Sequence, residues 1–244
     1  MWTERRTRTL SGAACIGVLA LCLTACPTAV PPVGSGGATP PEQVVAADGR
    51  EGRLYRVVAD QSLLQIFAYR GGSLARLGHN HVIAARHLQG NAWLPDDLRQ
   101  ARFDLTIPVA LLTIDEVELR AAAGADFASD VPDSARDATR RNLLSESLLD
   151  ADRFPGIRLR LLELAPAADR YEAIVAVTVK DTQTTLPVPL QLTTSAEVLR
   201  ASGELVVKQS QLGLKPFGVM LGALTVEDEL RIKFTVTARS PAVP

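Results

Sequence analysis

The chain has 244 residues, of which 47% are hydrophobic and 22% are charged, so it can bury a sizeable core. Its 26 basic and 27 acidic residues nearly cancel, so the sequence offers no overall basic field for nucleic acid. All three cysteines, Cys15, Cys22 and Cys26, lie near the N-terminus. The rest of the chain therefore has no disulfide, thiolate metal site or cysteine nucleophile.

The first 25 residues have the pattern of a signal peptide. Three arginines within the first eight residues precede an apolar run over 13–23, which is too short to span a bilayer. The tetrapeptide Leu-Thr-Ala-Cys ending at Cys26 resembles a bacterial lipoprotein signal, in which the cysteine becomes the lipidated first residue. The alternative is an ordinary secretory peptide with a chance cysteine. The lipoprotein interpretation predicts a periplasmic protein of the bacterial cell envelope, anchored to a membrane through Cys26.

Residues 26–52 follow as a segment rich in proline and glycine. This composition can support neither helix nor sheet, and it predicts a disordered tether between the anchor and a folded domain. No second linker and no internal repeat interrupts the chain after it. We therefore expect a single domain over 53–239 and a short tail over 240–244.

Strands dominate the expected domain. In the clearest case, 230–238, apolar residues alternate with Arg, Lys and Thr, which is typical of a half-buried antiparallel strand. Residues 180–184 form a polar turn between two apolar runs and predict a hairpin. Eight or nine strands are too many for one flat sheet of this size, so a barrel or a sandwich is expected. The predicted strands cover 55–59, 63–69, 82–94, 103–107, 157–161, 171–179, 188–192, 198–209 and 230–238.

One helix is predicted, over 131–144. Pro132 and Asp133 suit a helix start, and the alanines and leucines that follow suit its body. The alanine-rich stretch 121–126 has no convincing cap and is interpreted as a loop or a frayed helix.

The three histidines lie within nine positions, as His79, His81 and His87. In an extended segment these side chains would point to one side, as metal ligands or an acid/base pair would require. No carboxylate lies at short spacing, although folding could bring Asp104, Asp115 or Glu116 near. Three hypotheses stay open: hydrogen bonding within the protein, contact with a ligand, and a metal or acid/base site.

Other catalytic motifs are missing from the sequence. There is no Gly-x-Ser-x-Gly elbow and no glycine-rich phosphate loop, so a serine hydrolase and a nucleotide-binding protein are both disfavoured. Asp150 and Asp152 precede Pro155 in a turn-like setting, where solvated turn residues are commoner than a glycosidase pair. We interpret these two carboxylates as structural and expect no cofactor.

Five segments occur in a recognisable order, at 62–68, 78–81, 103–107, 149–157 and 211–214. Together they resemble the YceI-like lipid- and polyisoprenoid-binding family. The resemblance covers roughly 53–239, and its most specific part is the Asp-x-x-x-Phe-Pro-x-Ile turn starting at Asp150. It implies an extended, antiparallel, eight-stranded barrel of lipocalin type whose apolar cavity holds an isoprenoid, a quinone tail or a fatty acyl derivative, with no catalytic residue and no enzymatic activity. The family often has a glycine in the hairpin at 180–184, where this chain has none.

The apolar, inward-facing residues of each expected strand are the candidate ligand contacts. Plain core packing is the alternative for at least half of them in any β domain. They are Ile66, Phe103, Leu105, Ile107, Leu159, Leu161, Val175, Val177, Leu190 and Phe234.

Two classes of function compete at this stage. The first is a membrane-anchored carrier for an isoprenoid or acyl lipid, with no turnover and with affinity from burying methylene groups. The second is a metal-dependent or acid/base enzyme centred on His79 and His81. An adaptor for a membrane redox protein, built on the same barrel, is a third hypothesis.

Overall fold

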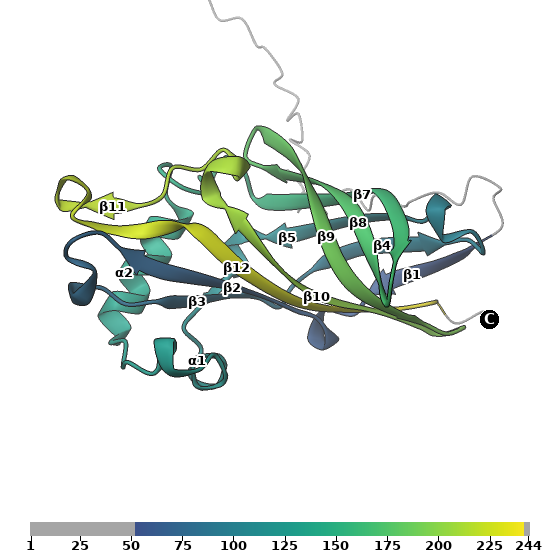
Figure 1. Cartoon of the computed structure of the whole chain (residues 1–244), viewed down its shortest axis with the longest axis horizontal. Coiled ribbons are helices and arrows are strands. Elements are labelled where there is room, and N and C mark those ends of the chain that lie inside the picture. The colour runs from purple at the N-terminus through teal and green to yellow at the C-terminus, as the bar shows by residue number, and fades with distance from the viewer. Residues whose placement is uncertain (1–51, 242–244) are drawn as a thin grey trace, which may run out of the picture. The chain divides into compact units, whose positions relative to one another are not determined.

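The computed structural model describes residues 52–241, which form a twelve-stranded antiparallel sheet and two α-helices (Figure 1). The predicted signal peptide, Cys26 and nearly all of the predicted tether lie outside the described residues. The strands are β1 (Arg53–Val57), β2 (Leu63–Gly71), β3 (His81–Ala85), β4 (Gln89–Leu94), β5 (Arg102–Pro108), β6 (Thr113–Ile114), β7 (Gly156–Ala167), β8 (Arg170–Val179), β9 (Thr182–Thr194), β10 (Val198–Lys208), β11 (Gly218–Val219) and β12 (Leu224–Arg239). The helices are α1 (Val117–Ala122) and α2 (Asp133–Leu144).

Eight of these strands close into a barrel in the order β1-β4-β5-β7-β8-β9-β10-β12. The ring closes because the last residues of β12 pair with β1, where Arg56 lies opposite Arg239 and Val57 lies opposite Ala238. The remaining strands extend this sheet at one end: β2 pairs with β12, β3 with β2, β6 with β3, and the short β11 with β12. The predicted all-β, eight-stranded antiparallel barrel is confirmed.

Two extended stretches of the chain are each divided into two strands. β1 and β2 are separated by a 3-10 turn, where the Ser62 hydroxyl donates to the Val58 carbonyl at 2.9 Å and accepts from the Thr237 amide at 3.1 Å. β3 and β4 are separated at 86–88, so the prediction of one continuous run over 82–94 is wrong. The chain turns there with Leu88 buried and His87 exposed.

The hairpin between β8 and β9 is tighter than the sequence predicts. Its turn is Lys180 and Asp181 alone, because Thr182 already pairs with Val179. Lys180 has φ +56°, a left-handed conformation that glycine adopts more easily. The hairpin therefore forms without a glycine, because Lys180 adopts the left-handed conformation itself.

The contact between β9 and β10 is short. Their ladder covers only 191–194 of β9 and stops before Pro189. Proline has no N–H to donate to a ladder, so Pro187 and Pro189 favour this break. The chain after β10, over 209–212, lies against β8 and β9 beyond the break. This segment carries Leu212 into the barrel wall.

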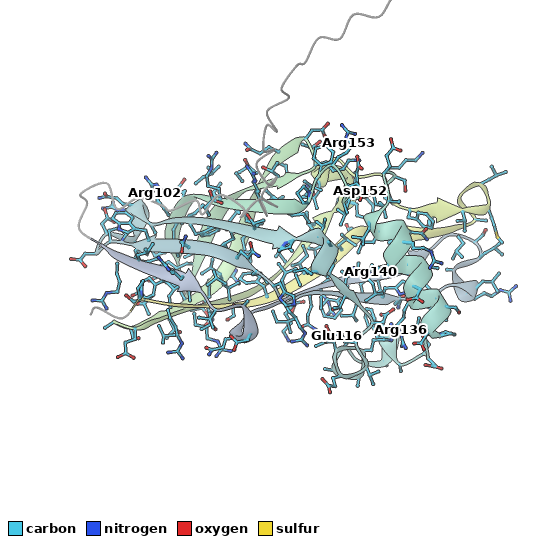
Figure 2. All side chains as sticks on the ribbon, turned by 180° about the vertical axis from the view of Figure 1, so that it is seen from behind. Arg102, Glu116, Arg136, Arg140, Asp152 and Arg153 are labelled. Atoms are coloured by element: carbon cyan, nitrogen blue, oxygen red, sulfur yellow. The ribbon has the colours of Figure 1, made fainter. Side chains whose placement is uncertain are left out.

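The helices lie at the end of the barrel where β2 ends and β3 begins (Figure 1). Helix α2 starts at Asp133, within the predicted range 131–144, and Arg140 on it donates to the carbonyls of Ala110, at 2.6 Å, and Leu112 (Figure 2). The expectation of one helix was wrong, because the six residues of α1 form a second one. In the described residues no helix is long and apolar enough to cross a bilayer. We call the end of the barrel that carries α2 the α2 end.

Candidate functional site

The barrel encloses a cavity of about 400 Å³. Its wall comes from the strands of the barrel, from β2 and β3, and from helix α2, and most of the lining side chains are aliphatic. On β12, for example, Leu230, Ile232 and Phe234 line the cavity while Arg231 and Lys233, which alternate with them, are not among the lining residues. A volume of this size lies in the range of roughly 300–1,000 Å³ typical of small-molecule sites.

Nine of the ten side chains predicted as ligand contacts line this cavity. These nine are Ile66, Phe103, Leu105, Ile107, Leu159, Val175, Val177, Leu190 and Phe234. Leu161 is different: it is 5% exposed and packs in the main core, next to the point where β7 shifts register against β8. Leu161 is therefore a buried core residue with which the residues that line the cavity can be compared.

Sequence periodicity missed part of the wall. Helix α2 contributes Thr139, Asn142 and Leu143, and the segments after β10 contribute Leu214 and Phe217. The signal for the helix residues was their i, i+3, i+4 spacing, which places them on one helix face. No periodic pattern marks the loop residues, because loops have no fixed side-chain alternation.

Two of the three histidines meet at the α2 end of the cavity. His79 precedes β3 and His81 is its first residue, and their ring centroids are 6.3 Å apart with both side chains in the cavity wall. His87 is exposed beyond the end of β3, so the expectation that it shares their face is wrong. The aliphatic cavity therefore has a polar region at one end only.

A buried carboxylate organises this polar region. Asp115 accepts from His81 Nδ1 at 2.6 Å, from the Val82 amide at 2.9 Å and from Arg120 Nη1 at 2.7 Å. Arg120 also donates to the Asn80 carbonyl at 2.6 Å. The suggestion that folding could bring Asp115 to the histidines is confirmed, across 34 residues of sequence.

The charge state of Asp115 follows from these contacts. Burial raises the pKa of its carboxyl, but hydrogen bonds from His81, Val82 and Arg120 outweigh burial, and the pKa is lowered overall. The ionised carboxylate accepts from His81 Nδ1, and the other ring nitrogen, Nε2, lies 3.3 Å from the Thr139 hydroxyl oxygen.

His79 is the polar side chain with an unmet hydrogen bond in this region. Its Nδ1 atom is buried and has no hydrogen-bond partner in the described part of the protein. Burial lowers the pKa of His79, and the charges of His81, Arg120 and Arg70 lower it further, so the ring is neutral at pH 7. A neutral imidazole can donate or accept one hydrogen bond to a ligand that enters the cavity.

The other predicted carboxylates do not join the histidines. Glu116 pairs with Arg86, with an oxygen 2.7 Å from Nη2, and Asp104 lies on β5 opposite Arg160. Within residues 52–241 no three His, Cys, Asp or Glu side chains are grouped so that they could hold a metal ion. Asp150 accepts from Arg153 in the turn before β7, as expected of a structural residue, but it is buried, so the expectation of a solvated side chain is wrong for it.

A closed eight-stranded antiparallel barrel around an apolar cavity with a polar end defines a lipocalin-like fold, which is consistent with binding an apolar ligand. The YceI-like domain matches residues 57–238, and the chain belongs to this family. Its structure is similar to the crystal structure of Burkholderia cenocepacia BcnA, with a TM-score of 0.54 and 18% identity over 74% of this chain and 98% of that one. It also resembles a Campylobacter jejuni YCEI protein, with a TM-score of 0.47 and 9% identity over 66% of this chain and 85% of the other. No curated protein matches the sequence.

Proposed function

We propose that this protein carries an apolar chain with a polar end, of the isoprenoid, quinone or fatty acyl class, in a bacterial cell envelope. The observation that carries the proposal is the largely aliphatic cavity of about 400 Å³. At its polar end lies the Nδ1 atom of His79, which has no hydrogen-bond partner in the described residues. Burying methylene groups in such a wall contributes about 0.8 kcal/mol each. Family membership supports binding rather than turnover.

The polar end gives the ligand its orientation. An apolar chain lies along the barrel with its polar group against His79 Nδ1, because an unpaired buried nitrogen is costly and a ligand hydroxyl or carbonyl satisfies it. Asp115, His81 and Thr139 form a connected hydrogen-bonded chain beside this position. In this proposal these three side chains fix the shape of the polar end of the cavity and do not act as an acid or base.

A matched pair of ligands tests the orientation. Dodecanol and dodecane share one chain and differ in a terminal hydroxyl, and both are titrated against a fluorescent dye bound in the cavity. Wild-type protein should bind dodecanol about 3- to 10-fold more tightly, the worth of one net hydrogen bond. In His79→Leu this preference should vanish while dodecane still binds. If neither ligand displaces the dye, the carrier proposal is wrong.

The membrane anchor is proposed on the lipoprotein-type sequence ending at Cys26. More than one acyl chain is needed for stable anchoring, and lipidation of an N-terminal cysteine supplies them. Cys26→Ala should release the domain from membrane fractions or block its maturation. A variant that matures and partitions with membranes like the wild type contradicts the anchor.

A further inference from the structure

Two adjacent loops at the α2 end expose large apolar side chains to solvent. The first loop, 74–78, carries Leu77, which is 56% exposed. The second, 217–224, carries Met220 at 65% and Leu221, which is fully exposed. The loops touch, since the Leu74 amide donates to the Ala223 carbonyl at 2.8 Å. We call them the loop pair.

The tip of the second loop has an unfavourable backbone. Met220 has φ +51° and Leu221 has φ +56°, so two consecutive non-glycine residues are left-handed. This conformation is costly for residues with a β-carbon. It directs two of the most exposed apolar side chains in the described residues away from the protein, and the described residues contain nothing that covers them. A costly conformation that exposes apolar groups points to a partner outside the protein.

The loop pair is continuous with the mouth of the cavity. Phe217, Val219 and Leu224 of the second loop line the cavity, as do Gly78, the last residue of the first loop, and His79 directly after it. Val219 is 40% exposed, so the cavity wall reaches the surface here. A ligand chain that leaves the cavity past these residues next meets Met220 and Leu221.

We infer that the loop pair inserts into the surface of a lipid bilayer and places the mouth of the cavity against it. This inference rests on the proposed carrier function for its purpose and for the delivery measurement below, but the quenching experiment tests it independently of that function. Projecting side chains suit a deformable lipid surface, because each can be buried there without a complementary pocket. The ligand chain could then pass between bilayer and barrel without crossing water.

The charges around the loop pair fit an anionic lipid surface. Arg76 lies next to Leu77, Arg70 donates to the Gly78 carbonyl at 2.6 Å, and Lys215 precedes the second loop. All three side chains are exposed, so basic groups outnumber the acidic ones here. The acidic groups nearby are Glu227, which is exposed beside Gly71, and Asp228, which accepts from the Ser210 hydroxyl at 2.6 Å. Basic residues close to inserted apolar groups strengthen binding to anionic headgroups.

The geometry of the proposed anchor permits this contact. The described chain begins at β1, which lies at the opposite end of the barrel from the loop pair (Figure 1). β12 has 16 residues and is about 50 Å long, and the barrel along which it runs is no longer than that because its strands are tilted. The residues between Cys26 and Gly52 can span at most ~90 Å. A protein anchored at Cys26 can therefore bring the loop pair to the same membrane.

Two tryptophan variants of the full chain test the inference. Leu221→Trp places a fluorophore at the tip, and Leu162→Trp places one on the outer face of β7, where Leu162 is 45% exposed. Each is mixed with vesicles of phosphatidylethanolamine and phosphatidylglycerol whose acyl chains carry bromine, with wild type as the blank. We expect bromine to quench most of the added fluorescence of Leu221→Trp and little of that of Leu162→Trp. Both variants keep Cys26, so the anchor alone cannot produce the difference.

Equal quenching of the two probes, or quenching of neither, overturns the inference. So does a blue shift of Leu221→Trp that occurs without vesicles and grows with protein concentration, because the loop pair would then be covered by a second copy of the chain. A lipid that co-purifies with a protein whose tip is not quenched leaves the carrier function intact and removes only the docking role.

A charge substitution adds a functional measurement. Leu221→Asp should slow delivery of a fluorescent fatty acid from the cavity to the same vesicles roughly tenfold, the effect of losing one buried leucine from the bilayer contact. Leu162→Asp should leave the rate unchanged. Equal rates for the two variants contradict insertion of the tip.

Discussion

Asp115 is the residue on which the polar end of the cavity depends. It is 2% exposed and has φ +54°, and its carboxylate binds a histidine, a backbone amide and an arginine at once. A buried carboxylate is tolerated only when its charge is compensated in this way. The surrounding groups are equally dependent on it, because Arg120 is buried as well.

Asp115→Asn should destabilise the protein strongly. The substitution keeps the shape and removes the charge, which leaves the buried guanidinium of Arg120 without its counter-ion. We expect a loss of about 3–5 kcal/mol in the free energy of unfolding by urea denaturation. Asp97→Asn is the control, since Asp97 forms an exposed ion pair with Arg99 and should leave the urea midpoint unchanged. A loss as small as that of the control would show that Asp115 is not a buried ionic centre.

His79 makes stability depend on pH. Its pKa is lowered in the folded protein, chiefly by burial, so the unfolded chain binds a proton more readily. The folded state is therefore penalised as the pH falls below 6.5, and the penalty becomes constant below the folded pKa. His79→Gln lacks this titration. The difference in unfolding free energy between wild type and variant should shift in favour of the variant from pH 7.5 to pH 5. A difference that does not change with pH contradicts the buried neutral histidine.

The sequence indicated the histidines and not their partners. His79 and His81 stand out because three histidines lie within nine positions, whereas Asp115 and Thr139 are 34 and 58 residues from His81. Contacts of that separation depend on how β3, β6 and α2 come together. Periodicity within one segment carries no information about them.

At the scale of elements, glycines determine how the loops approach each other. Gly72 has φ +86°, and a β-carbon there would lie 2.4 Å from the Ala223 carbonyl oxygen. Gly222 in the facing loop has φ +87° with no atom within 4 Å of such a β-carbon. Both positions require a left-handed backbone, but only at Gly72 would a β-carbon clash with a neighbouring loop.

Gly72→Ala should therefore destabilise more than Gly222→Ala. The second variant measures the cost of the left-handed conformation alone, about 1–2 kcal/mol. The first adds a clash with backbone that cannot rotate away, so we expect an additional loss of about 1–3 kcal/mol. Thermal unfolding monitored by circular dichroism compares them. Equal losses would show that the two loops do not touch in solution.

The strands were predictable because alternation is a local property. The long antiparallel run of β12 and the hairpin of β8 and β9 follow from period-2 patterning and a polar turn. Period-2 patterning missed the break between β3 and β4 at 86–88, although Arg86, His87 and Gln89 interrupt the apolar run there. Helix α1 was not predictable, because it has only six residues and no capping side chain.

At the scale of the whole molecule, the question is whether the barrel is hollow. Inward-facing residues could be predicted, but a wall and a solid core have the same pattern in sequence. Leu105 and Leu161 show this, because both face inward on neighbouring strands and only Leu105 borders the cavity. Which residues border empty space depends on the packing of all eight strands.

The same substitution at these two leucines separates a cavity from a core. Leu105→Trp can extend into the cavity and should cost less than ~1 kcal/mol, while Leu161→Trp overpacks the core and should cost about 1–3 kcal/mol or more. Urea unfolding of both variants gives the comparison. Equal and large losses would show that the interior at Leu105 is filled by side chains.

Native mass spectrometry of the protein purified from its own membrane environment tests the central claim most directly. The account predicts that wild-type protein carries an additional mass that organic extraction identifies as a chain lipid with a polar end. Leu105→Trp should remain folded and lose that mass. A wild-type protein that never carries such a mass, together with a Leu105→Trp variant as unstable as Leu161→Trp, would contradict the account.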